Sequence, residues 1–370
     1  MSTNFKYDIT AIVSQFCLEG KVNAIEPYIS GHINDTFLVR NEDPSCVDYL
    51  LQRINGNVFK DIPAMIANIQ QVTSHLRKKL AAQPGSDVTK EVLYLNKTRD
   101  GLYYYKDNSG NYWRIYNYIK DTNSYNIVTT EQQAYQGGLA FGRFQALLSD
   151  LDINLLTDTI PDFHNIEKRL ESFRKALLAN PKNRVKEVTA EIDFINKRAD
   201  KMCAILRLGE EGKLPKRITH NDTKFNNVLL NKNDEAQCVV DLDTVMAGYV
   251  AYDFGDAIRT SVNTAVEDEK DLDKIDINIA LFAAFTKGYL AESKIFITDE
   301  EVNSLFLGAL LLPYMQAVRF LTDYIEGDHY FKIDFPEHNL QRTKAQLRLL
   351  MRLEKHSEEL QALIITAASS

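Results

Sequence analysis

The spacing of apolar residues changes once along this 370-residue chain, near residue 120. Before that point, short segments rich in branched and aromatic residues alternate with turn residues, which is typical of antiparallel strands. After it, apolar residues recur mostly at the 3.6-residue period of amphipathic helices. We therefore expect an α+β protein in which a small sheet-bearing region precedes a larger, mainly helical one.

The first 118 residues are predicted to form an antiparallel sheet with one long helix inserted. The helix is expected to begin after Asp61 as its N-cap, because seven apolar residues then fall on one face between Ile62 and Leu80. Weak helical spacing also occurs from Asp8 to Leu18. Strands are expected at Val22–Tyr28, Thr36–Arg40, Tyr49–Ile54, Glu91–Leu95, Leu102–Lys106 and Asn111–Ile119.

The remainder of the chain is predicted to be helical, apart from short strand-like pieces within Arg217–Asp243. Helices are expected at Ala134–Leu148, Ile166–Leu178, Val185–Leu208, Glu300–Ile325 and Leu340–Leu363. The resulting domain prediction is an N-terminal lobe at 1–118, a connector at 119–126 and a C-terminal lobe at 127–370.

Composition and charge exclude several classes of protein. The net charge of −8 and pI near 5.5 give no overall basic surface for nucleic acid. The four cysteines lie far apart, which indicates reduced thiols in a cytoplasmic setting. The N-terminus has no export signal pattern, and the longest apolar run, Leu305 to Leu312, ends at Pro313. We expect neither nucleic acid nor a membrane as a partner.

A polar loop between two apolar segments carries the clearest chemistry. Ile218 to Leu230 contains the pattern H-x-D-x-K-x-x-N, which resembles the catalytic loop of protein kinases and of the aminoglycoside phosphotransferase and choline kinase superfamily. Phosphoryl transfer needs a carboxylate that orients the attacking hydroxyl and accepts its proton, a neutral oxygen ligand for magnesium, and a cation near the transferred phosphate. Asp222, Asn227 and Lys224 fit these roles respectively.

The segment Cys238 to Asp243 is an apolar strand that ends in the carboxylates Asp241 and Asp243. Carboxylate oxygens suit a hard cation, and Asp241 follows Asp222 by 19 positions (241 − 222), about the spacing at which this superfamily places its metal-binding aspartate. Asp241 is therefore the predicted magnesium ligand, with Asp243 as a candidate for a second ion.

A D-F-G string at Asp253 to Gly255 imitates the kinase metal motif but lies too far from Asp222. Its surroundings fit a helix start, so by resemblance Asp253 is expected to brace the catalytic loop. His220 is likewise expected to brace the loop. Each motif alone is common in turns and strand ends, whereas the loop, the D-x-D at a suitable spacing and the preceding sheet together favour a kinase.

The sheet region should bind the nucleotide phosphates. A glycine turn, Ser30 to Thr36, links two strands and would let backbone N–H groups approach phosphate. The strand Tyr49–Ile54 lacks the lysine that grips phosphates in most relatives, and Gln52 or Arg53 stands in its place. The candidate nucleotide-binding residues are Gly31, His32, Asn34, Thr36, Gln52, Tyr116 and Tyr118.

Five segments together resemble the N-acetylhexosamine 1-kinases: Gly31–Thr36, Thr219–Asn227, Asp241–Gly248, Asp253–Asp256 and Phe335–Leu340. Members of that family also carry glutamine in place of the strand lysine. The resemblance implies a protein-kinase-like two-lobe fold. It also implies phosphate transfer from ATP, with Mg²⁺, to the anomeric hydroxyl of N-acetylglucosamine or N-acetylgalactosamine.

The acceptor residues have no fixed spacing. The resemblance makes Arg319 the first candidate for a sugar hydroxyl, with Asp323, Tyr324 and His32 as further candidates; a structural Arg319–Asp323 ion pair is the alternative. Other readings of the whole chain are a kinase for choline, homoserine or an aminoglycoside, an inactive nucleotide-binding relative, and a magnesium-dependent phosphohydrolase.

Overall fold

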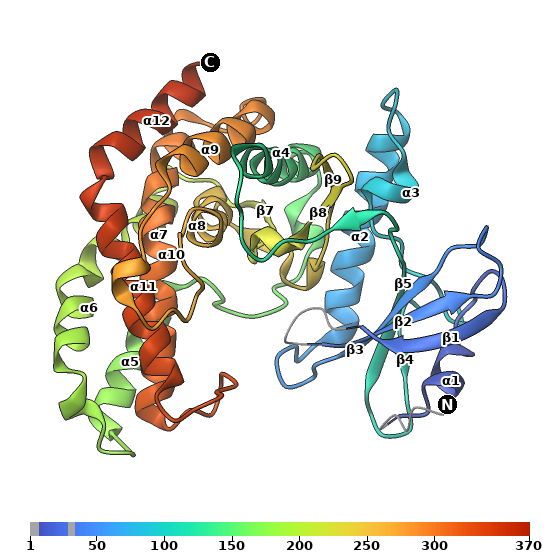
Figure 1. Ribbon diagram of the computed structural model, residues 1–370, viewed down its shortest axis with the longest axis horizontal. Helices are drawn as coiled ribbons and strands as arrows, with labels where there is room; N and C mark the ends of the chain where they lie inside the picture. The colour runs from blue at the N-terminus through green and yellow to red at the C-terminus, as the bar shows by residue number, and fades with distance from the viewer. Residues whose placement is uncertain (1–6, 29–33) are drawn as a thin grey trace. The chain divides into compact units, whose positions relative to one another are not determined.

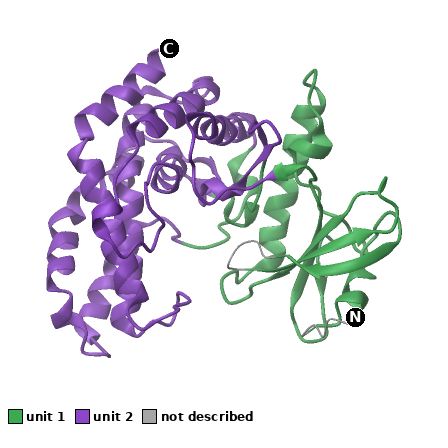
Figure 2. Ribbon diagram, in the orientation of Figure 1, with its two compact units in different colours: residues 1–122, 152–161, 238–246 green, residues 123–151, 162–237, 247–370 purple. Residues whose placement is uncertain are grey.

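The computed structural model describes residues 7–28 and 34–370 (Figure 1). It divides into two compact units (Figure 2). Unit 1 contains residues 1–122, 152–161 and 238–246, and unit 2 contains residues 123–151, 162–237 and 247–370. Unit 1 thus takes in two segments that lie in the predicted C-terminal lobe, one of which carries Asp241 and Asp243. The predicted connector at 119–126 stays a prediction.

Unit 1 is built on a five-stranded sheet in the order β1-β2-β3-β5-β4, and every strand pair is antiparallel. Four predicted strands correspond to β1, β2, β3 and β5 with small shifts at their ends, and β4 is shorter than the predicted Leu102–Lys106. The strands are β1 (Val22–Pro27), β2 (Asp35–Asn41), β3 (Tyr49–Ile54), β4 (Tyr105–Lys106) and β5 (Tyr112–Asn117).

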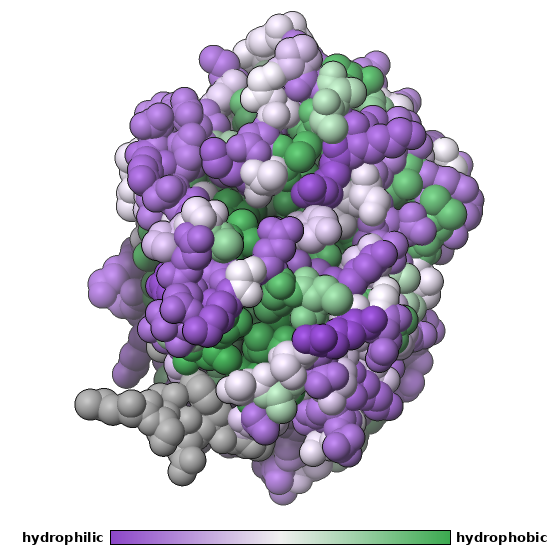
Figure 3. Space-filling model, turned by 90° about the vertical axis from the view of Figure 1, so that its right-hand side faces the viewer, coloured by the Kyte–Doolittle hydropathy of each residue, from purple (hydrophilic) through white to green (hydrophobic). Residues whose placement is uncertain are grey.

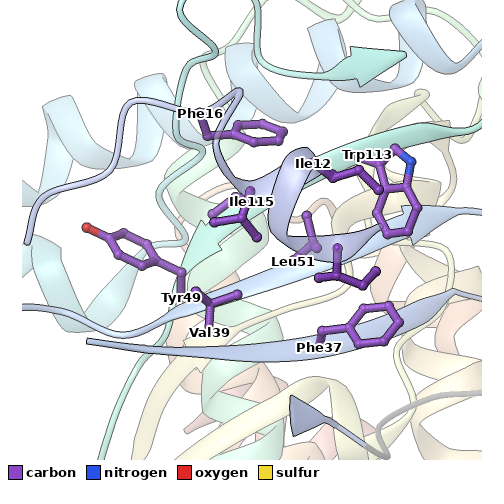
Figure 4. Packing of buried hydrophobic residues seen from close by; sticks show 10 residues of the cluster. Ile12, Phe16, Phe37, Val39, Tyr49, Leu51, Trp113 and Ile115 are labelled. Atoms are coloured by element: carbon purple, nitrogen blue, oxygen red, sulfur yellow. The ribbon is translucent and has the colours of Figure 1, made fainter. Parts of the chain in front are cut away.

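One face of this sheet packs on a short helix, α1 (Ile9–Val13), which ends earlier than the predicted segment 8–18. Figure 4 shows Ile12 and Phe16 lying over side chains from three strands. Because side chains alternate along a strand, Trp113 and Ile115 face this core, and Arg114 between them faces the opposite side. The other core members from the strands are Phe37, Val39, Tyr49 and Leu51.

The long helix α2 (Ile62–Ala81) confirms its prediction, including the N-cap, since the Asp61 carboxylate accepts a hydrogen bond from the Ala64 amide. Its buried Asn68 donates to the carbonyls of Thr157 and Val245, at 2.7 and 3.0 Å. These two carbonyls belong to the two later segments of unit 1, so one buried amide ties both segments to the helix.

The predicted strand Glu91–Leu95 is wrong. Val88–Glu91 forms the short helix α3, and only an isolated bridge pairs Leu95 with Tyr116. The reason is local capping: the Asp87 carboxylate accepts from the Thr89 amide, and Glu91 accepts from the Asp87 amide. These bonds stabilise a helical turn that ends at Glu91, and the apolar residues 92–95 follow it with only the single bridge to the sheet.

Unit 2 is mainly helical, as predicted, but two predicted helices are interrupted. The expected Val185–Leu208 divides at Cys203, and Leu340–Leu363 divides at His356. The helices are α4 (Glu131–Leu148), α5 (Ile166–Ala179), α6 (Thr189–Met202), α7 (Ala204–Glu210), α8 (Val250–Ser261), α9 (Ile279–Ser293), α10 (Asp299–Glu326), α11 (His338–Lys355) and α12 (Ser357–Ser369).

Helix α10 forms the centre of unit 2, in contact with α5, α8 and α11. Among the described residues it alone is long and apolar enough to cross a membrane by length and composition, but 78% of its apolar window is buried inside the protein. The apolar composition of α10 is therefore that of a core helix. Its start is fixed by a capping box, in which Thr298 and Glu301 each accept from the other's backbone amide.

The surface on the face drawn in Figure 3 is mixed, and its hydrophobic areas are bordered by hydrophilic side chains. Single exposed apolar side chains are normal on protein surfaces and indicate no partner by themselves.

Candidate active site

The catalytic-loop residues lie in unit 2, between β7 (Arg217–Thr219) and β8 (Val228–Asn231). The loop turns at Asn221, whose φ of +65° lies in the left-handed region that asparagine tolerates better than most residues. A 3-10 turn, Phe225–Asn227, then leads into β8. This backbone brings Asp222, Lys224 and Asn227 together, as the sequence predicts.

The Asp222 carboxylate is in contact with both other residues. Lys224 Nζ lies 3.0 Å from its Oδ1, and Asn227 Nδ2 donates to the Asp222 carbonyl at 2.8 Å and, more weakly, to its Oδ2 at 3.4 Å. One amide thus fixes both the backbone and the side chain of Asp222. The carboxylate remains one-quarter exposed, which leaves it accessible to a ligand.

Burial raises the pKa of Asp222, but the charge of Lys224, with a smaller electrostatic contribution from His220, outweighs burial and holds the pKa below its ordinary value. Asp222 in turn raises the pKa of Lys224 above its ordinary value. Both groups are therefore charged at neutral pH. The loop presents an ionised carboxylate beside a fixed cation.

Asp253 braces this loop from the first turn of α8, as expected. Its carboxylate accepts from the backbone amides of His220 and Asn221 at 2.8 and 2.7 Å, and from Gln145 Nε2 at 2.7 Å. It is 1% exposed, and burial raises its pKa to about 6 although these hydrogen bonds and His220 lower it. Asp253 of the D-F-G string therefore has a structural role, since from α8 it holds the backbone of the catalytic loop.

His220 is fully buried and contacts the rings of Phe141 and Phe144 edge-on, with centroids 5.7 and 5.8 Å away. Its Nδ1 accepts from the Asp222 amide at 3.3 Å. These contacts fit the loop-bracing role expected for it.

A second charged cluster near Lys224 was missed from the sequence. Arg259 is buried, donates to Asp256 at 2.9 Å and pairs with Glu267. Asp256 and Glu267 also raise the pKa of Lys224. The one available signal was Asp256 at the end of the motif Asp253–Asp256, since Arg259 follows one helical turn later.

Asp241 and Asp243 lie in unit 1, on either side of the first residue of the 3-10 turn η4 (Leu242–Thr244). Asp241 is exposed and has a φ of +60°, a left-handed conformation that costs about 1 kcal/mol for a residue with a Cβ atom. Such strain persists where the surrounding structure enforces it, often at functional sites. Asp243 is 2% exposed, and its predicted role with a second ion stays a prediction.

The polar side chains of unit 1 form a row across the sheet. Thr36 on β2 pairs with Gln52 on β3, and Gln52 pairs with Arg114 on β5. Gln52 Nε2 donates to Thr36 Oγ1 at 3.2 Å, and Gln52 Oε1 accepts from Arg114 Nε at 3.0 Å. Arg114 also forms a two-point ion pair with Asp243.

Gln52 and Arg53, the two residues considered for the missing lysine, face opposite sides of the sheet. Arg53 points to the opposite face, where it pairs with Asp35 at 2.6 Å and lies over the Tyr7 ring. Gln52, and not Arg53, therefore occupies the face of the polar row.

Arg114 is the residue of this row that the sequence analysis missed. Burial opposes its charge, but the Asp243 carboxylate outweighs burial and holds the pKa of Arg114 above its ordinary value. It lies over the ring of Tyr116, and burial raises the pKa of Tyr116 above its ordinary value. A single arginine inside the apolar strand Tyr112–Asn117 was the available signal.

The remaining nucleotide candidates are placed as follows. Asn34 Nδ2 donates to Asp243 Oδ2 at 2.9 Å, and Asn34 Oδ1 accepts from the Asn55 amide. Tyr118 is half-buried and contacts the Tyr28 ring edge-on. The predicted positions Gly31 and His32 lie outside the described residues.

The acceptor candidates lie near the end of α10 in unit 2. Arg319 is half-buried, donates to Gln316 at 2.9 Å and faces the rings of Phe163, Tyr330 and Phe331 at 5.3–5.8 Å. In the described part of the chain it forms no ion pair with Asp323.

Asp323 and Tyr324 are bonded within the protein. The buried Asp323 accepts from the backbone amides of His329, Tyr330 and Phe331 and from Asn339 Nδ2, at 2.8–2.9 Å, and so holds the loop after α10. The hydroxyl of Tyr324 donates to Glu187 at 3.2 Å, and its ring lies beneath Arg184. Of the three acceptor candidates among the described residues, Arg319 is the one that is not fully buried.

Residues 7–28 and 34–370 contain no group of three or more His, Cys, Asp and Glu side chains that could hold a metal ion. A site without such a group can still suit Mg²⁺, because Mg²⁺ is commonly held by one or two carboxylates together with substrate phosphates and water. In unit 1 the exposed Asp241 carboxylate is an oxygen donor of this type.

The antiparallel sheet, the helical region and the braced Asp-Lys-Asn loop define a phosphotransferase with a kinase-like fold, which confirms the predicted fold class. The model of the phosphotransferase enzyme family matches residues 24–289. Because this match covers more than half of the chain, the chain belongs to that family.

Solved structures share the fold at low sequence identity. An aminoglycoside phosphotransferase from Alicyclobacillus acidocaldarius has a TM-score of 0.60 at 12% identity, covering 99% of this chain and 97% of the other. A choline kinase from Cryptosporidium parvum has a TM-score of 0.59 at 13% identity, covering 98% and 99%. A spectinomycin phosphotransferase in complex with ADP and spectinomycin has a TM-score of 0.55 at 12% identity, covering 91% and 95%.

Proposed function

We propose that this phosphotransferase transfers the γ-phosphate of ATP to the anomeric C1 hydroxyl of an N-acetylhexosamine, N-acetylglucosamine or N-acetylgalactosamine. The observation that carries the kinase activity is the Asp222 carboxylate, ionised beside Lys224 and fixed by Asn227. The motifs shared with the N-acetylhexosamine 1-kinases support the choice of acceptor. The complex of a structural relative with ADP supports a nucleotide as phosphate donor.

In this proposal Asp222 orients the acceptor hydroxyl and takes its proton as the bond to phosphorus forms. Lys224 keeps Asp222 ionised and supplies positive charge for the transferred phosphoryl group. Asp241 and Asn227 would hold Mg²⁺, which supplies charge neutralisation for the phosphates when bound. Asp253 keeps the loop in one conformation through its bonds to the His220 and Asn221 amides.

The surface around Arg319 supports a sugar as acceptor. A guanidinium can donate to a sugar hydroxyl, and three aromatic rings beside it offer apolar faces against which a sugar ring can pack. Asp323 contributes indirectly, because it holds the amides of the loop that carries two of those rings. We also propose a cytoplasmic location, which is consistent with the four free cysteines.

The acceptor is tested by phosphate transfer from labelled ATP to N-acetylglucosamine, N-acetylgalactosamine, choline, homoserine and an aminoglycoside. The N-acetylhexosamines should be the preferred substrates. The 6-deoxy sugar should react, because its C1 hydroxyl is intact, and the methyl glycoside should not. Phosphorylation of the methyl glycoside, detected by mass spectrometry, would contradict transfer to C1, and preference for choline or an aminoglycoside would contradict a sugar acceptor.

The base is tested by Asp222→Asn. We expect a loss of kcat of roughly 10²-fold or more, the scale of general-base catalysis, with nucleotide affinity close to that of the unchanged protein. Asp158→Asn is a matched control, because Asp158 lies outside the catalytic loop. Near-normal turnover of Asp222→Asn would exclude Asp222 as the base.

A further inference from the structure

A buried cation stands directly opposite the position where the family's strand lysine is expected. Gln52 on β3 and Arg114 on β5 are register partners, and directly opposed side chains lie on the same face of a sheet about 5 Å apart. The positive charge is therefore absent from β3 but present on the next strand, at the same level of the sheet.

Arg114 is bonded on two sides. Its Nε and Nη2 donate to Gln52 Oε1 at 3.0 and 2.8 Å, and its Nη1 and Nη2 donate to the two oxygens of Asp243. The side chains of Arg114 and Asp243 are only 1% and 4% exposed. A planar guanidinium can satisfy both partners at once, which a lysine ammonium cannot do with the same geometry.

Asp243 connects this ion pair to two predicted ligand-binding segments. It lies in η4, two residues after the exposed and left-handed Asp241. It also accepts from Asn34, whose own Oδ1 accepts from the Asn55 amide at the end of β3. Asp243 thus joins Arg114 both to the turn that follows Asp241 and to Asn34.

We propose that Arg114 is the positioning residue of the magnesium–nucleotide site in unit 1, supplying from β5 the buried positive charge that β3 lacks at Gln52. This inference rests on the proposed binding of a magnesium–nucleotide complex. Arg114 acts through Asp243, which holds η4 and thereby the direction of the Asp241 carboxylate. Asp243 serves as the anchor of this arrangement, since Arg114 and Asn34 occupy its oxygens.

If the Arg114–Asp243 pair served stability alone, apolar side chains at these positions would stabilise the fold at least as well. A buried ion pair is often no more stabilising than apolar side chains of similar volume, and the neighbouring strand positions Trp113 and Ile115 are apolar. The ion pair does fix the orientation of the Asp243 carboxylate, because a two-point guanidinium–carboxylate contact allows only one geometry. That orientation is passed along the turn to Asp241.

The proposal is tested with variants that place the positive charge on β3 instead of β5. Three variants are compared: Arg114→Gln, Gln52→Lys, and the double variant Gln52→Lys/Arg114→Gln, in which the cation and the glutamine exchange strands. Isothermal titration calorimetry measures ADP affinity with Mg²⁺ and with EDTA, at a temperature where circular dichroism shows each variant to be folded.

Arg114→Gln should weaken ADP binding in Mg²⁺ by at least about tenfold, the scale of a lost charge-assisted interaction, with a smaller change in EDTA. Gln52→Lys alone should not tighten binding, because it places a second cation beside Arg114. The double variant should recover part of the magnesium-dependent affinity, because the lysine restores a positive charge beside Asp243 without the two-point contact. Arg198→Gln is the matched control, because it breaks another two-point pair, with Glu354 at 2.8 and 2.9 Å between α6 and α11, and should leave ADP affinity unchanged.

The proposal is overturned if Arg114→Gln binds ADP in Mg²⁺ like the unchanged protein, or if the folded double variant is as weak as Arg114→Gln. Should neither of these variants fold, Arg114→Lys decides. It keeps the charge but not the two-point contact, so an intermediate affinity supports the proposal and unchanged affinity refutes it. ADP binding needs no acceptor, so a chain that binds ADP in this way but phosphorylates no sugar would refute the sugar kinase alone.

Discussion

Asp222 in the catalytic loop and Asp253, which braces the loop, have pKa values shifted in opposite directions. Asp222 faces Lys224, and its pKa is held below the ordinary value despite burial. Asp253 accepts hydrogen bonds from two backbone amides and Gln145, and burial raises its pKa to about 6 although His220 and these bonds lower it. Asp222 is therefore ionised at neutral pH beside Lys224, whereas Asp253 is buried against the backbone amides that it binds.

This difference predicts a pH dependence of stability. The folded protein holds a proton on Asp253 up to about pH 6, whereas the unfolded chain releases it near pH 4. The stabilising contribution is full below pH 4 and is lost as the pH rises through about 6, a difference of roughly 3 kcal/mol.

Urea unfolding of the unchanged protein and of Asp253→Asn between pH 4 and pH 7 measures this effect. The asparagine side chain of the variant cannot ionise, so the difference in unfolding free energy between the two proteins should shift in favour of the variant as the pH rises. A difference that stays constant across this range would contradict the raised pKa.

At the residue scale, motif spacing identified the loop residues because phosphoryl transfer restricts their order. Asp253 was correctly assigned as a brace, since its distance from Asp222 did not fit the metal ligand. Arg114 could not be predicted, because its partner Asp243 lies 129 residues away. A charged residue in a strand usually faces solvent, and only the fold shows that this one does not.

At the scale of elements, glycines set how closely the helices of unit 2 approach each other. A Cβ atom added at Gly138 on α4 would collide with the Phe285 carbonyl on α9, and one at Gly288 on α9 would collide with the Tyr135 carbonyl. The hydrophobic period predicted α4, α5 and α10 well. It did not predict the breaks at Cys203 and His356.

Gly138→Ala should therefore destabilise the protein by several kcal/mol, since the methyl group meets backbone that cannot rotate away; overpacking typically costs about 1–3 kcal/mol and more against rigid atoms. Gly56→Ala is the matched control, because its nearest heavy atom would be 4.0 Å away and its backbone is not left-handed. Thermal unfolding followed by circular dichroism compares the two. Equal transition midpoints would mean that α4 and α9 are not in tight contact at this glycine.

At the scale of the whole molecule, the two units are interleaved along the chain. Unit 1 includes residues 152–161 and 238–246 in addition to its N-terminal segment. Sequence pattern could locate the change from strands to helices, but not these insertions. They are joined to unit 1 by individual buried contacts, such as the bonds of Asn68 to the Thr157 and Val245 carbonyls.

An N-terminal fragment of residues 1–126 should therefore not fold into a stable domain, although it contains the whole five-stranded sheet and α2. In the fragment Arg114 loses Asp243, and Asn68 loses both of its carbonyl acceptors. An unpaired buried charge costs about 3–5 kcal/mol and an unsatisfied buried amide about 1–3 kcal/mol more, which is comparable to the stability of a small domain.

The fragment can be compared with Arg114→Leu/Asn68→Leu in the same residues 1–126, which removes both unpaired groups. Circular dichroism and urea titration should show no cooperative transition for the unchanged fragment and a gain of structure for the substituted one. Cooperative unfolding of the unchanged fragment would demonstrate that the sheet and α2 are self-sufficient, and that the two later segments contribute residues to unit 1 without being required for its folding.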